Sequence, residues 1–136
     1  MSASRIHHIN FIVRDLALAA EQFQLVLGLD PFEFIDHAPR GAKVARSRIG
    51  DTWFVLVCPF DPESVPGRFL AANGEGFFLL STATSDLQAQ LNRLASDGLT
   101  PIDRQPRIGI LDWRVADIAE VHGVMLQFTD DSDSGS

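Results

Sequence analysis

The chain has 136 residues, of which 46% are apolar and 21% charged, so one compact soluble domain is expected. Its formal net charge is −7 and its basic residues are scattered, which argues against nucleic acid and anionic membranes as partners. Because it has a single cysteine and no apolar run of membrane-spanning length, a cytoplasmic protein without disulfides is expected.

The first predicted helix follows a β-rich stretch at residues 6–13. Asp15 precedes apolar residues at helical spacing and Gly28 follows them, so a helix between these two caps is expected. Further β-rich runs at residues 31–36, 43–49 and 52–59 predict strands. Residues 60–74 are interrupted by prolines and glycine, and they predict a connecting loop.

The second half repeats this order. A β-rich stretch at 76–83 precedes a helix that begins with Ser85 and Gln88 at capping-box spacing and ends at Gly98. Strands are then expected at 101–104, 108–115 and 124–129. Shifting the chain by about 70 residues superimposes its halves, as an internal repeat requires.

The repeat predicts an α+β fold made of two βαβββ modules. They are expected at about residues 5–60 and 75–129, joined by a linker at 60–74, and to pair into a curved mixed sheet with a central cleft. Together they form a single domain over residues 1–130, followed by a flexible acidic tail at 131–136.

Alternation along the strands divides their residues between two faces. One set is uniformly apolar and suits the helices: Ile9, Phe11, Val13, Phe54, Leu56, Cys58, Phe78, Leu80, Val124, Leu126 and Phe128. The other set mixes polar groups with aromatic ones, as small-molecule pockets do. The candidate ligand-binding residues on it are His8, Asn10, Trp53, Val55, Phe77, Leu79, Met125 and Gln127.

Four segments carry a resemblance to a known family: His8–Leu16, Gly50-Asp51-Thr52 with the strand ending at Pro59, Gly74-Glu75-Gly76, and His122–Phe128. Through them the chain resembles the vicinal oxygen chelate superfamily of glyoxalase I, bleomycin-resistance proteins and methylmalonyl-CoA epimerase. The epimerase branch is the most similar. The resemblance covers essentially the whole chain and implies the glyoxalase-like fold and a homodimer.

The resemblance also implies where a metal would bind. Enzymes of this family bind one divalent metal through four side chains, and the matching positions here are His8, Val55, Leu79 and Gln127. The repeat relates the same positions, His8 to Leu79 and Val55 to Gln127. Since Val55 and Leu79 have no donor atom, no metal cofactor is expected, and His8 and Gln127 are only residual candidates.

Gln127 stands where enzymes of the family often have a glutamate, and an amide cannot act as a general base. The alternative to a protein without a metal cofactor is one with a divalent metal ion at a displaced site, with Glu75, Glu120 and His122 as its candidate ligands.

Several other residues allow two interpretations. His8 is a pocket residue or a structural histidine, and Trp53 either lines a pocket or packs beneath the connecting loop. Arg46 and Arg48 share a strand face, where they bind an anionic ligand or, as the favoured interpretation, are solvated edge residues. Cys58 is expected to be buried and inert, and Asp112-Trp113-Arg114 to be structural.

Two functions from different classes follow. The favoured one is a metal-free protein that binds a small organic ligand in an apolar and aromatic cleft, and an acidic surface would suit a cationic ligand. The alternative is an epimerase- or lyase-like enzyme for a CoA thioester or an α-keto compound, with a displaced metal site or a metal-free acid/base pair. The sequence does not decide between binding and catalysis, and it assigns no catalytic residue.

Overall fold

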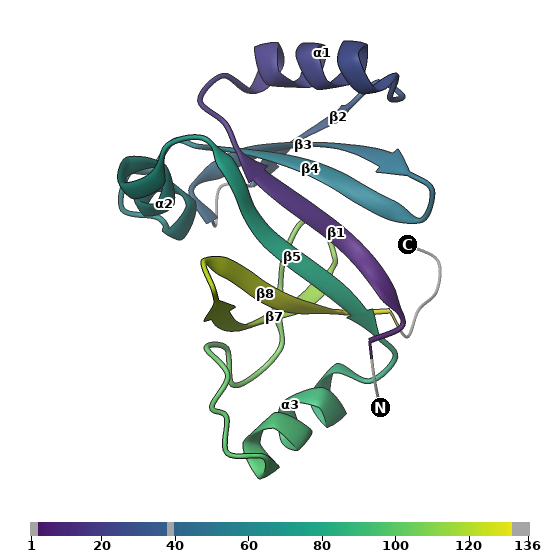
Figure 1. The fold of residues 1–136 in the computed structure, drawn as a ribbon, viewed down its shortest axis with the longest axis vertical. Helices are drawn as coiled ribbons and strands as arrows, with labels where there is room; N and C mark the ends of the chain where they lie inside the picture. The colour runs from purple at the N-terminus through teal and green to yellow at the C-terminus, as the bar shows by residue number, and fades with distance from the viewer. Residues whose placement is uncertain (1–2, 38–39, 132–136) are drawn as a thin grey trace. The chain divides into compact units, whose positions relative to one another are not determined.

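A computed structural model describes residues 3–37 and 40–131 of the chain. Its contacts divide the chain into two compact units, whose elements are drawn in Figure 1. The first unit is His8–Phe78, and the second combines the residues up to His7 with those from Leu79 onward. The first unit is therefore one continuous segment, whereas the second is built from both ends of the chain.

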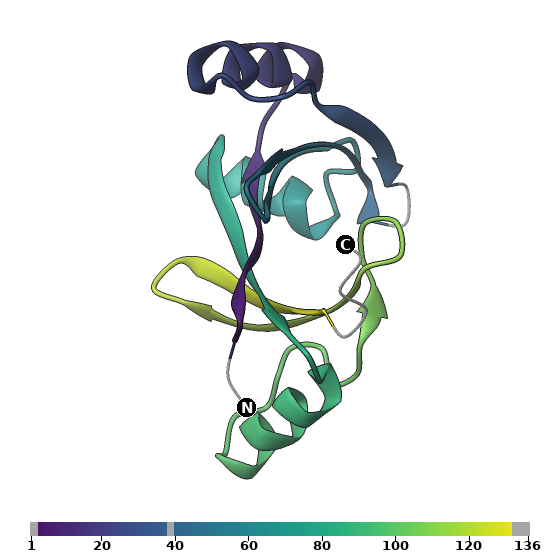
Figure 2. The same cartoon turned by 90° about the vertical axis from the view of Figure 1, so that its right-hand side faces the viewer.

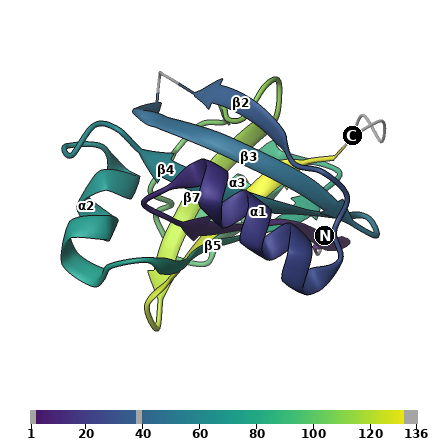
Figure 3. The same cartoon turned by 90° about the horizontal axis from the view of Figure 1, so that it is seen from above.

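The first unit contains most of β1 (Arg5–Ile12), then α1 (Leu16–Leu27), β2 (Glu33–His37), β3 (Ala42–Ile49), β4 (Thr52–Pro59) and α2 (Val65–Asn73). Neighbouring strands are hydrogen-bonded in the order β2-β3-β4-β1, with β4 parallel to β1 and antiparallel to β3. Figure 2 shows β3 and β4 curving together. Figure 3 looks down on α1, which packs against β3 and β4.

Helix α1 has the caps that the sequence predicts. The Asp15 side chain accepts a hydrogen bond from the Leu18 amide, and Gly28 ends the helix with a φ of 69°, which a residue without Cβ adopts easily. Beneath the helix lies a cluster that contains all six residues predicted to face it in this half: Ile9, Phe11, Val13, Phe54, Leu56 and Cys58. The helix-facing set of the first half is thereby confirmed.

The second unit contains the start of β1, then β5 (Gly76–Thr84), α3 (Leu87–Ser96), β6 (Arg107–Ile108), β7 (Arg114–Val121) and β8 (Val124–Asp130). Its strand order is β5-β8-β7-β6, with β8 parallel to β5 and antiparallel to β7. Helix α3 covers a buried cluster made of Leu87, Leu91, Ala116 and Ile118, with Leu94, Ala119 and Phe128 packed against it.

The start of α3 differs from the prediction by one residue. Asp86, not Ser85, is the N-cap, and its side chain accepts a hydrogen bond from the Ala89 amide. The capping box of Ser85 and Gln88 is therefore wrong. Gln88 instead donates a hydrogen bond to Asn92, one turn further along the helix.

Strand pairing confirms the internal repeat. In the first unit Asn10 lies opposite Val55 across the parallel pair, and in the second Ser81 lies opposite Gln127 across the equivalent pair. Each unit has the same pattern of one parallel pair and two antiparallel pairs. The predicted α+β class and its two βαβββ modules are confirmed.

The segment at 60–74 is not a loop throughout, because it contains α2. Ser64 caps this helix by accepting a hydrogen bond from the Gly67 amide, and Pro66 lies in its first turn, where no amide hydrogen is needed. A Cβ on Gly67 would lie 2.2 Å from the Asp61 carbonyl oxygen, so this close approach requires glycine.

Two of the strands predicted for the second half are not found as predicted. Residues 101–104 form no regular strand, although the Ile102 and Asp103 amides donate to carbonyl oxygens of β7. The strand predicted at 108–115 is interrupted between β6 and β7, where the Gly109 amide donates to the Trp113 carbonyl across a tight loop.

The first and last described residues are held within the second unit. The Ser4 amide donates to the Ala83 carbonyl, and Arg5 forms an ion pair with Asp131 at 3.2 Å. Asp131 is therefore anchored, in contrast to the predicted frayed tail, and residues 132–136 lie outside the described part of the chain. No helix among the described residues has the length and apolar character to cross a membrane.

Candidate functional site

In the first unit, the strand face turned away from α1 carries four of the predicted ligand-binding residues. His8 lies opposite Trp53, and Asn10 lies opposite Val55. His8 and Val55 are almost fully buried, and Asn10 is 8% exposed. The Oδ1 atom of Asn10 has no hydrogen-bond partner among the described residues, so this face holds a buried polar atom that the fold does not satisfy.

Two arginines from β3 extend the same face. Arg46 lies opposite Val55 and Arg48 opposite Trp53, so both arginines share a face with the predicted residues. Their guanidinium carbons lie 4.0 Å and 4.9 Å from the centre of the Trp53 ring system. These are cation–π distances, at which the ring helps to hold the positive charges in place.

Arg46 is not a solvated edge residue, which corrects the favoured sequence interpretation. Its side chain is 10% exposed, and its Nε lies 2.9 Å from a carboxylate oxygen of Glu33 on β2. Trp53 is half-buried and lies against the arginines, rather than only packing beneath a loop. A cationic and aromatic group is therefore built into this face.

The equivalent face of the second unit carries Leu79 opposite Met125 and Ser81 opposite Gln127. Leu79, Ser81 and Gln127 are buried. The Ser81 and Thr129 hydroxyls share a hydrogen bond at 2.6 Å, so each has a partner. The four residues predicted to converge, His8, Trp53, Leu79 and Gln127, divide between the two units, and their convergence on one cavity stays a prediction.

Gln127 belongs to a buried polar network. Its Nε2 donates to Asp117 Oδ1 at 2.9 Å, and the other oxygen of Asp117 lies 3.0 Å from Arg107 Nη2. Arg107 also pairs with Asp103 at 2.8 Å, and Asp103 in turn accepts a hydrogen bond from the Asp117 amide. The carbonyl oxygen of Gln127 has no partner among the described residues.

Phe77 departs from the predicted alternation at the start of β5. It is 38% exposed, and its ring meets the edge of Phe11, a residue of the helix-facing set, with centroids 5.4 Å apart. Phe78, predicted to face a helix, contacts Phe69 of α2 at 5.0 Å. Phe77 thus lies with the α1 cluster in the first unit, and its ligand-binding role stays a prediction.

The residues at the family's metal positions do not fit a divalent ion. Val55 and Leu79 are buried hydrocarbon side chains, and the Gln127 amide nitrogen is already bonded to Asp117. A divalent ion needs several oxygen, nitrogen or sulfur donors, which this set does not supply. Among the described residues, no three His, Cys, Asp or Glu side chains form a group that could hold a metal ion.

Glu75, Glu120 and His122, the candidate ligands of a displaced metal site, do not belong to a metal-binding group within the described part of the chain. Glu75 is exposed and accepts a hydrogen bond from the Arg14 amide, while Glu120 and His122 are exposed near the β7–β8 turn. Cys58 packs against the α1 cluster and its thiol donates to the Arg14 carbonyl. Burial raises the pKa of the Cys58 thiol, which favours the inert interpretation over a nucleophile.

Two aromatic groups have structural roles in the second unit. His7 is fully buried, and its ring meets the buried Trp113 edge-on with centroids 4.7 Å apart. This contact places Trp113 in the packing of the unit, in line with the structural interpretation, while its neighbours Asp112 and Arg114 are exposed.

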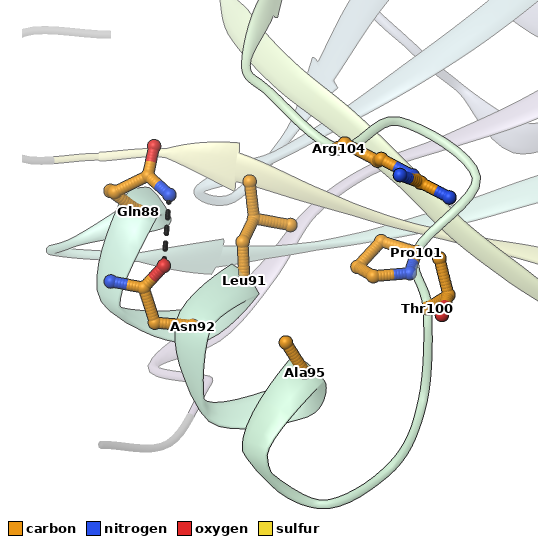
Figure 4. Close-up of a pocket in the computed structure, with 7 residues that line it drawn as sticks. All are labelled: Gln88, Leu91, Asn92, Ala95, Thr100, Pro101 and Arg104. Atoms are coloured by element: carbon orange, nitrogen blue, oxygen red, sulfur yellow. Dashed lines mark hydrogen bonds between the residues drawn. The ribbon is translucent and has the colours of Figure 1, made fainter.

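A groove of about 290 Å³ lies between α3 and the chain that follows it, drawn in Figure 4. It is lined by Gln88, Leu91, Asn92, Ala95, Thr100, Pro101 and Arg104. Its two amide side chains bond to each other at 3.1 Å, as the dashed line in Figure 4 shows. None of the lining residues belongs to the predicted ligand-binding set.

Sequence reasoning missed Asp117 and Arg107, and it undervalued Arg46. Arg46 lies opposite Val55, and Asp117 lies opposite Gln127, so the two charged residues are counterparts in the repeat. The repeat offset applied to Arg46 would have found Asp117. The misplaced strand at 108–115 hid this relationship.

The two βαβββ units and their shared pattern of strand pairing define a glyoxalase-like protein. The chain belongs to the glyoxalase/bleomycin resistance protein/dioxygenase superfamily, whose family model matches residues 7–116. The resemblance inferred from the sequence is therefore confirmed.

Solved structures and a curated relative agree with this membership. The chain is similar to a methylmalonyl-CoA epimerase in complex with methylmalonyl-CoA and NH4+, with 26% identity over 95% of both chains and a TM-score of 0.89. It is also similar to the methylmalonyl-CoA epimerase of Mycobacterium tuberculosis, with 26% identity, a TM-score of 0.88, and coverage of 94% of this chain and 88% of that one. The uncharacterized protein YqjC of Bacillus subtilis (strain 168) is 27% identical over 126 residues, which are 91% of this chain and 90% of that protein.

Proposed function

We propose that this chain binds a small organic ligand bearing an anionic group, and that it does so without a metal ion. The observation that carries the proposal is Trp53 lying against Arg46 and Arg48 on the strand face of the first unit that is turned away from α1. His8, Asn10 and Val55 share that face. Leu79, Met125 and Gln127 of the second unit are retained as proposed ligand positions.

The arginines suit a carboxylate or a phosphate. A guanidinium has five N–H donors in a planar fork that matches such groups. The Trp53 ring and Val55 offer apolar surface to an acyl chain or an aromatic ring. This local charge favours an anion, in contrast to the cationic ligand that the net charge of −7 suggests.

The test uses phenylacetate and its uncharged analogue phenylacetamide in thermal denaturation. A ligand that binds only the native state raises the melting temperature, so phenylacetate should raise it more than phenylacetamide. Trp53→Ala and Arg46→Gln should each abolish the phenylacetate-dependent shift. Arg68→Gln, an exposed arginine of the same unit, is the matched control and should keep it. Equal shifts with both compounds, or an unchanged shift in Arg46→Gln, would refute the proposal.

A second candidate is an epimerase- or lyase-like enzyme for a CoA thioester or an α-keto compound. The similarity to epimerase structures, one of them in complex with methylmalonyl-CoA, favours it. The lack of a general base at Gln127 argues against it. Incubation with methylmalonyl-CoA in D₂O followed by mass spectrometry separates the two: deuterium incorporated at the α-carbon, above a protein-free control, would favour the enzyme.

We also propose a homodimer. Strands β2 and β6 end the strand order of their units, and proteins usually cover or pair such edges. Sedimentation equilibrium at micromolar concentration should give the mass of two chains, and the mass of one chain would contradict the proposal.

A further inference from the structure

The amide of Gln127 can take only one orientation. Its neighbour Asp117 is a carboxylate bound to Arg107, and a carboxylate accepts hydrogen bonds but has no hydrogen to donate. Turning the amide over would place two oxygen atoms against each other. The NH₂ group of Gln127 must therefore face Asp117, and its carbonyl oxygen must face elsewhere.

That carbonyl oxygen is an unsatisfied acceptor in a buried place. Gln127 is 7% exposed, and its Oε1 atom has no hydrogen-bond partner among the described residues. The Ser81 hydroxyl lies in the same row of side chains, but it bonds to the Thr129 hydroxyl. Because burial removes a polar atom from water, this oxygen is stabilised by any group that brings a hydrogen to it.

The charges around Gln127 favour the same kind of partner. Asp103 and Asp117 both lie against Arg107, and Asp117 also accepts the hydrogen bond from the Gln127 amide. An anionic group placed at Gln127 Oε1 would meet a lone pair and would lie near the Asp117 carboxylate. The equivalent position to Asp117 in the first unit is Arg46, which has the opposite charge.

We infer that Gln127 Oε1 accepts a hydrogen bond from a hydroxyl or N–H group of the ligand, and that Asp117 is the positioning residue that fixes this preference. The inference rests on the proposed function, because it takes Gln127 to be a ligand position. It adds a requirement at the second unit: a ligand that binds there brings an uncharged donor group to Gln127. A ligand with only a carbonyl or ether oxygen at this point is disfavoured.

The experiment compares two uncharged compounds, phenol, which has a donor hydroxyl, and anisole, in which a methoxy group replaces it. Dissociation constants are measured by NMR titration, following the side-chain amide signal of Gln127. Phenol should bind about tenfold more tightly than anisole, the ratio expected for one hydrogen bond. Gln127→Met, which keeps the length of the side chain and removes the acceptor, should lose this preference when the titration follows backbone amides of β8.

Gln90→Met is the matched control, since it makes the same change at a buried glutamine of α3 and should keep the preference. Asp117→Asn provides a second variant: an asparagine can donate or accept, so the Gln127 amide can turn and the preference should fall. Equal binding of phenol and anisole, or binding of neither, would overturn the inference. A phenol preference without a Trp53-dependent phenylacetate shift would overturn the proposed function instead, so the two failures are distinguishable.

Discussion

Arg46 and Asp117 show how one repeated position can hold opposite charges in the two halves of a chain. Each lies on the third strand of its module, opposite a residue that the family resemblance assigns to metal binding. Arg46 lies against the Trp53 ring, and Asp117 accepts a hydrogen bond from the Gln127 amide. The two modules have therefore diverged in chemistry while keeping the same strand pairing.

Cys58 permits a prediction about reactivity and pH. Burial raises its pKa, so at neutral pH the thiolate, which is the reactive form, is scarcer than in a free thiol. Alkylation by iodoacetamide at pH 7.5, followed by intact mass, should be slower than that of N-acetylcysteine under the same conditions. Alkylation at an equal or greater rate would contradict the inert interpretation.

The raised pKa of Cys58 also has a consequence for stability. Because the folded-state pKa lies above the unfolded one, the unfolded chain loses the thiol proton first as the pH rises. The contribution of Cys58 to the free energy of unfolding is complete below the unfolded pKa and is lost as the pH rises from there through the higher folded-state pKa. Cys58→Ala should remove this part of the alkaline decline, measured by urea denaturation between pH 8 and pH 10.

At the residue scale, the sequence was sufficient to place His8, Asn10, Trp53 and Val55 on one strand face, and the structure pairs them across β1 and β4. Alternation and the repeat depend only on backbone geometry, which every strand obeys. The burial of Arg46 could not be predicted from the sequence, because alternation predicts only which face of a strand a side chain lies on. The exposure of the Arg46 side chain depends on Glu33 and Trp53, which come from two other strands.

At the scale of elements, the start of α3 gives a sharp prediction. Asp86 accepts the hydrogen bond of the Ala89 amide, so Asp86→Ala should lower the free energy of unfolding by about 1 kcal/mol. Serine is also able to cap a helix, but the neighbouring Ser85 does not do so here. Ser85→Ala should therefore lower the free energy of unfolding much less than Asp86→Ala. Urea denaturation of both variants makes the comparison, and a larger loss for Ser85→Ala would show that the cap is misassigned.

Helix α2 shows why one element was missed. Proline and glycine usually indicate a loop, yet Pro66 occupies the first turn and Gly67 lies where the backbone of Asp61 comes too close for a side chain. The contact with Asp61 depends on how the turn before the helix folds, and the residue types in this segment carry no sign of it. Helix α1, in contrast, was predictable because both of its caps and its apolar stripe are local features.

At the scale of the whole molecule, the donor set predicts the metal content. Val55 and Leu79 replace two of the four donors that the family's enzymes use, so protein purified without a metal-affinity step should contain far less than one equivalent of Zn, Ni, Co or Mn. Elemental analysis by mass spectrometry measures this directly. One bound equivalent that disappears in His8→Ala would contradict the prediction and favour the enzyme.

The boundary between His7 and His8 has a consequence for how the chain folds during synthesis. The first unit is complete once residue 78 has left the ribosome, because all of its strands come from one continuous segment. Arg5–His7 are synthesised before the first unit but belong with strands that are synthesised after it, and the Arg5 partner Asp131 lies beyond β8. This short segment therefore has to wait until β8 has been synthesised before it finds its native neighbours.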